Sequence, residues 1–317
     1  MATGYYTHTD CLKHEMGEGH PESPERLSAI EDRLIASGLA NFLEHRQASP
    51  ATDSQLQMAH SPAYIARLQS EQEILRQERA AGGPAYRYVD SETMLNEFTC
   101  LAARRAAGLA IESTRAVASG ELTNAFCAIR PPGHHAQKSH AHGFCFFNNV
   151  ALAALYALNH LGLERVAIVD FDVHHGDGTQ SILAPDPRVL LAGFFQYPFF
   201  PFADTPFTAG NTLNIPVERY TKGSAIREMI TSRWLPALDE FAPQMIFISA
   251  GFDAHREDDM GQLGLVENDY AWITRQIMQI AKRHASGRIV SCLEGGYDLS
   301  ALGRSVEVHI RALAGLD

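Results

Sequence analysis

Short runs of β-branched and aromatic residues, separated by helical patterns, restrict the fold of this chain more than any other feature. Six such runs predict buried strands: Asn124–Arg130, Arg165–Val173, Arg188–Phe195, Thr212–Val217, Gln244–Phe252 and Arg288–Leu293. Helical patterns lie between most of them, as in Val266–Ile280, where apolar residues recur every three or four positions. This alternation favours an α/β fold with an open, mostly parallel sheet and helices on both faces.

The 317 residues contain no internal repeat, low-complexity tract or Ser/Pro-rich linker that would divide the chain. We therefore expect one domain over residues 1–317. The first 95 residues carry helix signals, such as Ser23-Pro-Glu-Arg before an apolar-periodic run. We expect this part to wrap the sheet rather than to form a second domain.

Composition excludes several classes of function. The formal charge of −11 argues against a nucleic-acid binder that works through phosphate contacts. The longest uninterrupted apolar run, Val150–Leu158, is far shorter than the roughly 20 residues that span a bilayer. No signal peptide is visible, and five scattered cysteines suit a reducing compartment. These features predict a cytoplasmic protein without nucleic-acid or membrane partners, and they leave a homo-oligomer open.

Polar motifs follow four of the predicted strands. They are Arg130-Pro-Pro-Gly-His-His, Asp170-Phe-Asp-Val-His-His-Gly-Asp-Gly, Ser249-Ala-Gly-Phe-Asp-Ala-His and Glu294-Gly-Gly-Tyr. Seven of the 15 histidines fall between His134 and His175, more than an even spread would place there. Because ligands of open parallel sheets bind outside the carboxyl ends of the strands, the motifs predict one shared crevice.

Asp172 and His174 have the spacing of metal ligands. Residues two apart at a strand end point the same way, so one divalent ion can take both side chains. Asp253 can supply a third ligand from another strand. Two carboxylates and one imidazole leave coordination positions open for water and substrate, as a catalytic metal requires. This ligand set suits Zn²⁺, with Fe²⁺ as the alternative.

His134 and His135 follow a stiff Pro-Pro-Gly turn and are candidates for general acid–base chemistry near neutral pH. Asp170 and Asp177 flank the proposed metal ligands and can orient the two imidazoles. The plainer alternative is an exposed histidine pair in a loop.

Tyr297 follows Gly295 and Gly296, whose small size allows close backbone approach, and both glycines count among the predicted substrate-binding residues. A tyrosine hydroxyl at this point can donate to an oxyanion, although a core tyrosine is the alternative. Together with the metal ligands and histidines, it predicts metal-assisted hydrolysis of an amide.

These motifs, together with Gly143-Phe-Cys-Phe-Phe-Asn-Asn, resemble the zinc-dependent histone deacetylase family, which includes acetylpolyamine amidohydrolases. The resemblance is densest over Asn124–Gly296, extends weakly to His20–Arg26 and is nearest to the class II branch. It implies one arginase/deacetylase-type domain whose substrates are acylated lysine peptides or proteins, or acetylated small amines. It implies zinc ligands at Asp172, His174 and Asp253. It implies catalytic positions at His134, His135, Asp170, Asp177 and Tyr297, with His135 as the general base.

The resemblance also implies a narrow tunnel for the acyl-lysine chain, lined by Gly143, Phe144 and Phe200. Asp90 and Glu92 are both candidates for the rim residue that grips the substrate backbone. Polyamine-selective relatives carry glutamate where this chain has Met260, and a neutral thioether does not attract a cationic amine. We therefore expect a preference for acyl-lysine over acetylpolyamine.

Gly193 is one departure from the family pattern, and two other functions are alternatives to a deacetylase. Gly193 stands where relatives carry a serine that binds a structural K⁺ ion, so we expect that K⁺ site to be weakened. A binuclear ureohydrolase would need further carboxylates where this chain has Gly176 and His255. A non-catalytic acyl-lysine binding protein would not need Tyr297, which argues for catalysis.

Overall fold

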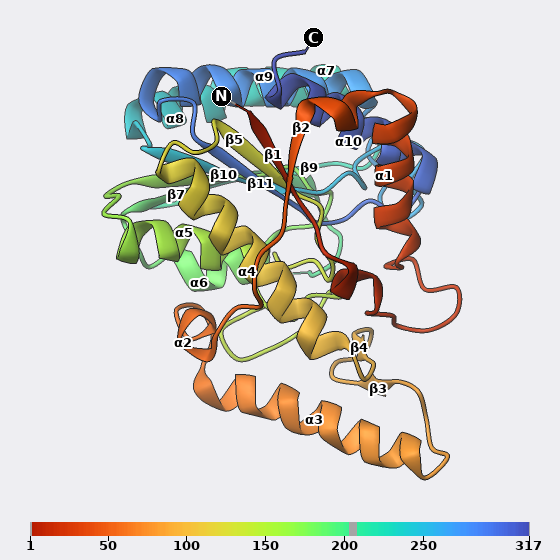
Figure 1. The fold of residues 1–317 in the computed structure, drawn as a ribbon. Coiled ribbons are helices and arrows are strands. Elements are labelled where there is room, and N and C mark those ends of the chain that lie inside the picture. Colours follow the sequence, from red (N-terminus) through yellow and green to blue (C-terminus); the bar gives the residue numbers. More distant parts are fainter. Residues whose placement is uncertain (1, 203–207, 317) are drawn as a thin grey trace.

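The computed structural model describes residues 2–202 and 208–316, and a nine-stranded sheet lies at the centre of this part (Figure 1). Its strands are β1 Thr3–Tyr6, β2 Leu43–Arg46, β5 Asn124–Cys127, β6 Val166–Asp170, β7 Val189–Gln196, β8 Thr208–Ala209, β9 Thr212–Val217, β10 Met245–Ala250 and β11 Ile289–Leu293. Their order is β2-β1-β5-β11-β10-β6-β7-β9-β8. Every neighbouring pair is parallel except β8 and β9.

Helices cover both faces of this sheet. The helices of the described residues are α1 Glu25–Ala36, α2 Asp53–Leu56, α3 Pro62–Ala80, α4 Thr99–Ala118, α5 Asn149–His160, α6 Asp177–Leu183, α7 Gly223–Met229, α8 Leu235–Phe241, α9 Glu267–His284 and α10 Leu299–Leu313. In Figure 1, α1 and α7–α10 lie on one side of the strands, and α4, α5 and α6 lie on the other. The predicted open α/β architecture is confirmed.

The amino-terminal part does more than wrap the sheet. Although α1 begins within Ser23-Pro-Glu-Arg as expected, β1 is inserted between β2 and β5, and Thr3 is in register with Leu43 and Asn124. These strands escaped prediction because neither Thr-Gly-Tyr-Tyr nor Leu-Glu-His-Arg lies in a longer apolar run, whereas the equally short β5 does. Gly4 further obscures the pattern, yet a Cβ there would lie 2.6 Å from Leu122 Cδ1. A short hairpin of β3 Arg87–Tyr88 and β4 Met94–Leu95 follows α3.

The helical segment over residues 223–241 is not one regular α-helix. It consists of α7, a π-helical turn at Ile230–Trp234 and α8. Trp234 is fully buried and stacks on Phe194 at 5.6 Å between ring centroids. In the described part of the chain, no helix is both long and apolar enough to cross a membrane.

Strand order explains why distant motifs meet. The four strands that precede the polar motifs, β5, β11, β10 and β6, are consecutive neighbours at the centre of the sheet. All run parallel, so their carboxyl ends open at the same edge. Polar side chains that lie far apart in sequence are thereby brought to one crevice, where α/β sheets bind ligands.

Candidate active site

Asp172, His174 and Asp253 converge at the carboxyl ends of β6 and β10. One donor atom from each residue lies within 4.8 Å of the others, and all three side chains are buried. His174 Nδ1 is 3.0 Å from Asp172 Oδ1 and 3.2 Å from Asp253 Oδ2. The backbone N–H of Val173 donates to Asp253 Oδ1 at 2.8 Å and fixes that carboxylate. The three predicted ligands therefore present their donors to one point.

The charges at this point suit a cation. Burial and the nearby Asp172 carboxylate raise the pKa of Asp253 above its usual value. Asp253 Oδ2 is buried and makes no hydrogen bond within the described residues. Two carboxylates that are buried side by side repel each other unless a positive charge lies between them. Oxygen and imidazole donors in this arrangement fit a divalent metal ion.

Two glycines make room for the carboxylates. A Cβ at Gly251 would lie 1.9 Å from Asp172 Oδ2, and one at Gly295 would lie 2.0 Å from Asp253 Oδ2. The Gly295 N–H also donates to Asp172 Oδ2 at 2.9 Å. Any larger residue at either glycine would displace the proposed ligands.

Each of the tandem histidines is oriented by its own aspartate. His134 Nδ1 donates to Asp170 Oδ2 at 3.1 Å, and His135 Nδ1 donates to Asp177 Oδ1 at 2.8 Å. Burial alone would lower the pKa of His134, but the Asp172 and Asp170 carboxylates raise it well above its usual value. Burial and the neighbouring His134 lower the pKa of His135 to about 3. His134 therefore favours its charged form, and His135 its neutral form.

Glu294 fixes the loop that carries these histidines. The sequence alone did not indicate this role. Glu294 Oε2 accepts from the N–H groups of Gly133 at 2.7 Å and His134 at 3.1 Å. In the sequence, the Glu294-Gly-Gly-Tyr motif predicts a role for its tyrosine only. No local pattern marks a buried glutamate that accepts hydrogen bonds from a distant loop.

Tyr297 lies at the end of the cavity, partly buried. Burial raises its pKa well above the usual value, so the hydroxyl remains a hydrogen-bond donor. The Arg26 guanidinium lies 4.9 Å from the centre of its ring. Arg26 also donates to the carbonyl oxygens of Gly296 at 2.6 Å and Glu294 at 2.5 Å. Arg26 therefore holds the segment that places Tyr297, and sequence reasoning missed it.

A cavity of about 210 Å³ borders part of this cluster. Its lining residues are Glu92, His135, Gly143, Phe144, His174, Phe199, Phe200, Asp259, Met260 and Tyr297. Five predicted substrate-binding residues are among them: Gly143, Phe144, Phe200, Met260 and Glu92. Gly295 and Gly296 lie behind Tyr297 and do not line it, since their backbone groups contact Asp172 and Arg26.

Aromatic rings form the walls of this cavity. Phe199, which was not predicted as a wall, stacks on His174 at 5.4 Å with an interplanar angle of 16°. Phe200 meets His135 edge-on at 5.1 Å, and Phe144 meets Tyr297 at 6.1 Å. The walls therefore contact the same imidazoles that the chemistry would use.

The structure distinguishes the two candidate rim residues, Asp90 and Glu92. Glu92 lines the cavity, and burial together with the nearby Asp90 raises its pKa. Asp90 does not line it. Its Oδ1 instead accepts from the Glu92 N–H at 3.2 Å and from the Ser91 hydroxyl at 2.8 Å. Asp90 therefore shapes its own turn, and Glu92 faces the path to the cavity.

At Gly193, the space for a side chain is already taken. A Cβ there would lie 2.7 Å from Asn214 Oδ1, on the neighbouring strand β9. The amide of Asn214 donates to Gln180 Oε1 at 2.8 Å. The Asn214 oxygen therefore occupies the space that a side chain at position 193 would need.

Comparisons with known proteins identify the family of this chain. The family model described as "Histone deacetylase domain" matches residues 20–313. The chain is 39% identical to the mouse "Polyamine deacetylase HDAC10", over 99% of this chain and 48% of that protein. It is 37% identical to a "Probable deacetylase" of Archaeoglobus fulgidus, over 100% of this chain and 88% of that protein.

A solved structure agrees in fold as well. The structure titled "Crystal Structure of HDA15 HD domain" superposes with a TM-score of 0.91 at 32% identity, over 99% of this chain and 90% of that chain. The fold and the convergent polar site define a deacetylase domain of the α/β class. The chain belongs to the histone deacetylase family.

Gly143→Ala should disable the site without unfolding the protein. Gly143 has φ of +58°, and a Cβ there would lie 2.4 Å from His135 Cδ2, so the imidazole must move. A misplacement of about 1 Å can cost roughly 100-fold in rate. We expect a loss of that order in kcat on an acetyl-lysine peptide.

Gly120→Ala is the matched control, because Gly120 also has positive φ, at +80°, but its Cβ would meet no atom within 4 Å. Both variants should lose about 1–2 kcal/mol of stability through backbone strain. Equal activity of the two variants would contradict the placement of His135.

Proposed function

We propose that this chain is a zinc-dependent deacetylase that removes acetyl or related acyl groups from lysine side chains. Asp172, His174 and Asp253 would hold the zinc ion, or Fe²⁺ as the alternative, and residues 1–317 would act as one domain. The observation that carries the proposal is the cluster of these three donors, one of which, His174, lines the same aromatic-walled cavity as His135 and Tyr297. When bound, the ion supplies a Lewis acid for the substrate carbonyl and an activated water.

The proton transfers fall to the two histidines. His135, kept neutral by burial and by His134, accepts the proton of the attacking water, while Asp177 holds its Nδ1–H. The proton then passes to the departing amine. His134 remains charged beside Asp170 and adds positive potential where negative charge develops on the substrate.

Tyr297 stabilises the oxyanion. Its raised pKa keeps the proton on the hydroxyl, which can donate to the developing charge as the carbonyl becomes tetrahedral. Phe144, Phe199 and Phe200 exclude water around this point, which strengthens each of these electrostatic contacts. The same rings contact the aliphatic chain of the substrate, while Glu92 lies within reach of its backbone.

An acetylpolyamine substrate is the second candidate. Glu92 and Asp259 line the cavity and can attract a cationic amine. The mouse relative is named a polyamine deacetylase. Met260, however, adds no charge at the position where polyamine-selective relatives carry glutamate, and this favours acyl-lysine as the substrate.

A binuclear ureohydrolase fits the site poorly. It would need a second carboxylate at Gly176, where even a Cβ would lie 2.4 Å from Asp170 Oδ2. The other position is His255, which is fully buried with its Nε2 3.6 Å from Glu267 Oε2. A structural K⁺ ion remains a prediction, with backbone carbonyls as its main ligands.

A substrate panel tests the preference. The panel compares kcat/KM for acetyl-lysine and longer acyl-lysine peptides with N-acetylated putrescine and spermidine. We expect the peptides to be preferred, because Met260 offers no charge to a polyamine. A large advantage for the acetylated polyamines would contradict the proposed substrate class, and inactivity on every acyl amine would contradict the deacetylase proposal itself.

Tyr297→Phe separates catalysis from binding. Loss of one oxyanion donor should lower kcat by about 10²–10³-fold. Metal content and the affinity for a hydroxamate inhibitor should persist, because the ring and its contacts with Phe144 and Arg26 are retained. An unmodified protein that is already inactive but still binds acyl-lysine would instead support a binding module.

A further inference from the structure

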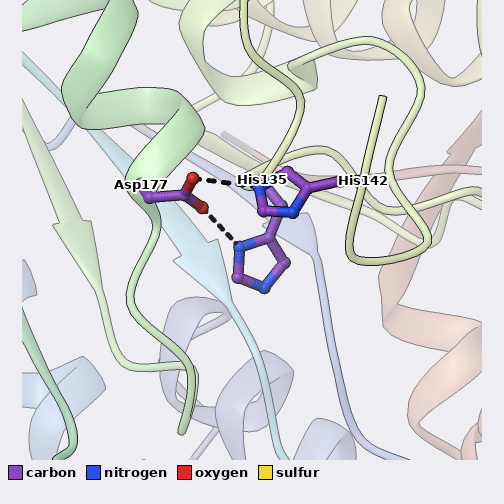
Figure 2. A group of neighbouring side chains, drawn as sticks. All are labelled: His135, His142 and Asp177. Carbon is purple, nitrogen blue, oxygen red and sulfur yellow. Dashed lines mark hydrogen bonds and ion pairs between the residues drawn. The ribbon is translucent and has the colours of Figure 1, made fainter. Parts of the chain in front are cut away.

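The Asp177 carboxylate serves more than the general base. Its Oδ1 accepts from His135 Nδ1 at 2.8 Å, and its Oδ2 accepts from His142 Nε2 at 2.9 Å (Figure 2). Oδ2 also accepts from Gln137 Nε2 at 2.9 Å. A carboxylate with three donors is fixed in orientation, and its negative charge is shared among them. The position of His135 therefore depends on groups that it does not itself contact through a hydrogen bond.

His142 also touches the wall of the cavity. Its ring lies 5.5 Å from that of Phe200 and 5.4 Å from that of His135, measured between centroids. The Cys145 N–H donates to the His142 carbonyl at 3.0 Å, so the backbone at this point is held in a turn. The side chain is only 13% exposed. These contacts leave the imidazole little freedom to turn away from Asp177.

The charges around His142 favour its role as a donor. Burial alone would lower its pKa, but the Asp177 hydrogen bond and the carboxylates of Asp90 and Glu92 raise it. His140, whose Nε2 is 3.4 Å from Asp90 Oδ2, is the other titratable group on this loop that faces it. A charged imidazole donates from both nitrogens and cannot act as an acceptor.

We infer that His142 is a positioning residue for the deacetylation reaction, which fixes the Asp177 carboxylate so that His135 is held beside the cavity with its Nδ1–H directed to Asp177. The inference rests on the proposed function, because His135 matters as a base only if the chain hydrolyses acyl amides.

The same three side chains also lie close enough to hold a metal ion. The hydrogen bonds favour the positioning role, because His135 Nδ1, His142 Nε2 and both oxygens of Asp177 are already paired with one another. An ion here would replace these bonds and take away the partner of His135.

His142→Phe and His142→Gln provide the test. Phenylalanine keeps a ring against Phe200 but removes the donor to Asp177, whereas glutamine retains an N–H donor. Loss of a supporting hydrogen bond of this kind typically costs about 10–100-fold in activity. We expect His142→Phe to lose that much in kcat with KM nearly unchanged, and His142→Gln to recover most of it. His140→Gln, on the same loop, is the control and should keep the parental kcat.

Proton NMR of the ¹⁵N-histidine-labelled protein gives a readout that does not depend on turnover. The His135 Nδ1–H proton should resonate far downfield in the parent, shift in His142→Phe and return towards its place in His142→Gln. Equal kcat in all three proteins, equal losses in the two His142 variants or an unshifted proton signal would overturn the inference.

Two further outcomes remain distinguishable. If the parent hydrolyses no acyl amide, the proposed function fails, and the proton signal still decides whether His142 positions the pair. If His142→Phe does not fold, His142→Leu replaces it in the same comparison.

Discussion

The repulsion between two buried carboxylates governs this active site. Asp172 and Asp253 extend from neighbouring strands, β6 and β10, and neither side chain is exposed to water. A protein does not hold two such charges together without compensation. Backbone N–H groups of Val173 and Gly295 supply part of it, and a bound cation would supply the rest.

Much of the surrounding structure follows from this constraint. Gly251 and Gly295 are needed because any side chain there would overlap the carboxylate oxygens. The charged form of His134 is favoured by the Asp172 and Asp170 carboxylates, and that charge in turn lowers the pKa of His135. The different protonation states favoured by His134 and His135 are therefore set by the neighbouring aspartates.

Sequence reasoning reached the fold and the centre of the site because both depend on local patterns. Most of the buried strands lie in recognisable runs of β-branched and aromatic residues, and motifs such as Asp172-Val-His174 keep their donors within three residues. It missed β1 and β2, whose residues do not lie in a longer apolar run. It also missed Arg26, Glu294 and His142, because each acts across a long sequence separation.

The residues at the rim of the cavity could be predicted only in part from the sequence, for the same reason. Asp90 and Glu92 are two residues apart and were equivalent candidates in the sequence. Only the folded turn separates them, because Asp90 accepts from the Glu92 N–H and is drawn away from the cavity. Phe199 is a similar case, since its stacking on His174 depends on how the chain enters the loop after β7.

The metal content of the purified protein tests the central claim most directly. Elemental analysis after zinc loading and extensive dialysis should find one ion per chain. Asp253→Asn keeps the shape of the side chain but removes its charge, and it should lose the ion. Asp259→Asn, which alters a carboxylate that lines the cavity outside the three-residue group, should keep it. Two ions per chain, or an unchanged zinc content in Asp253→Asn, would contradict the account.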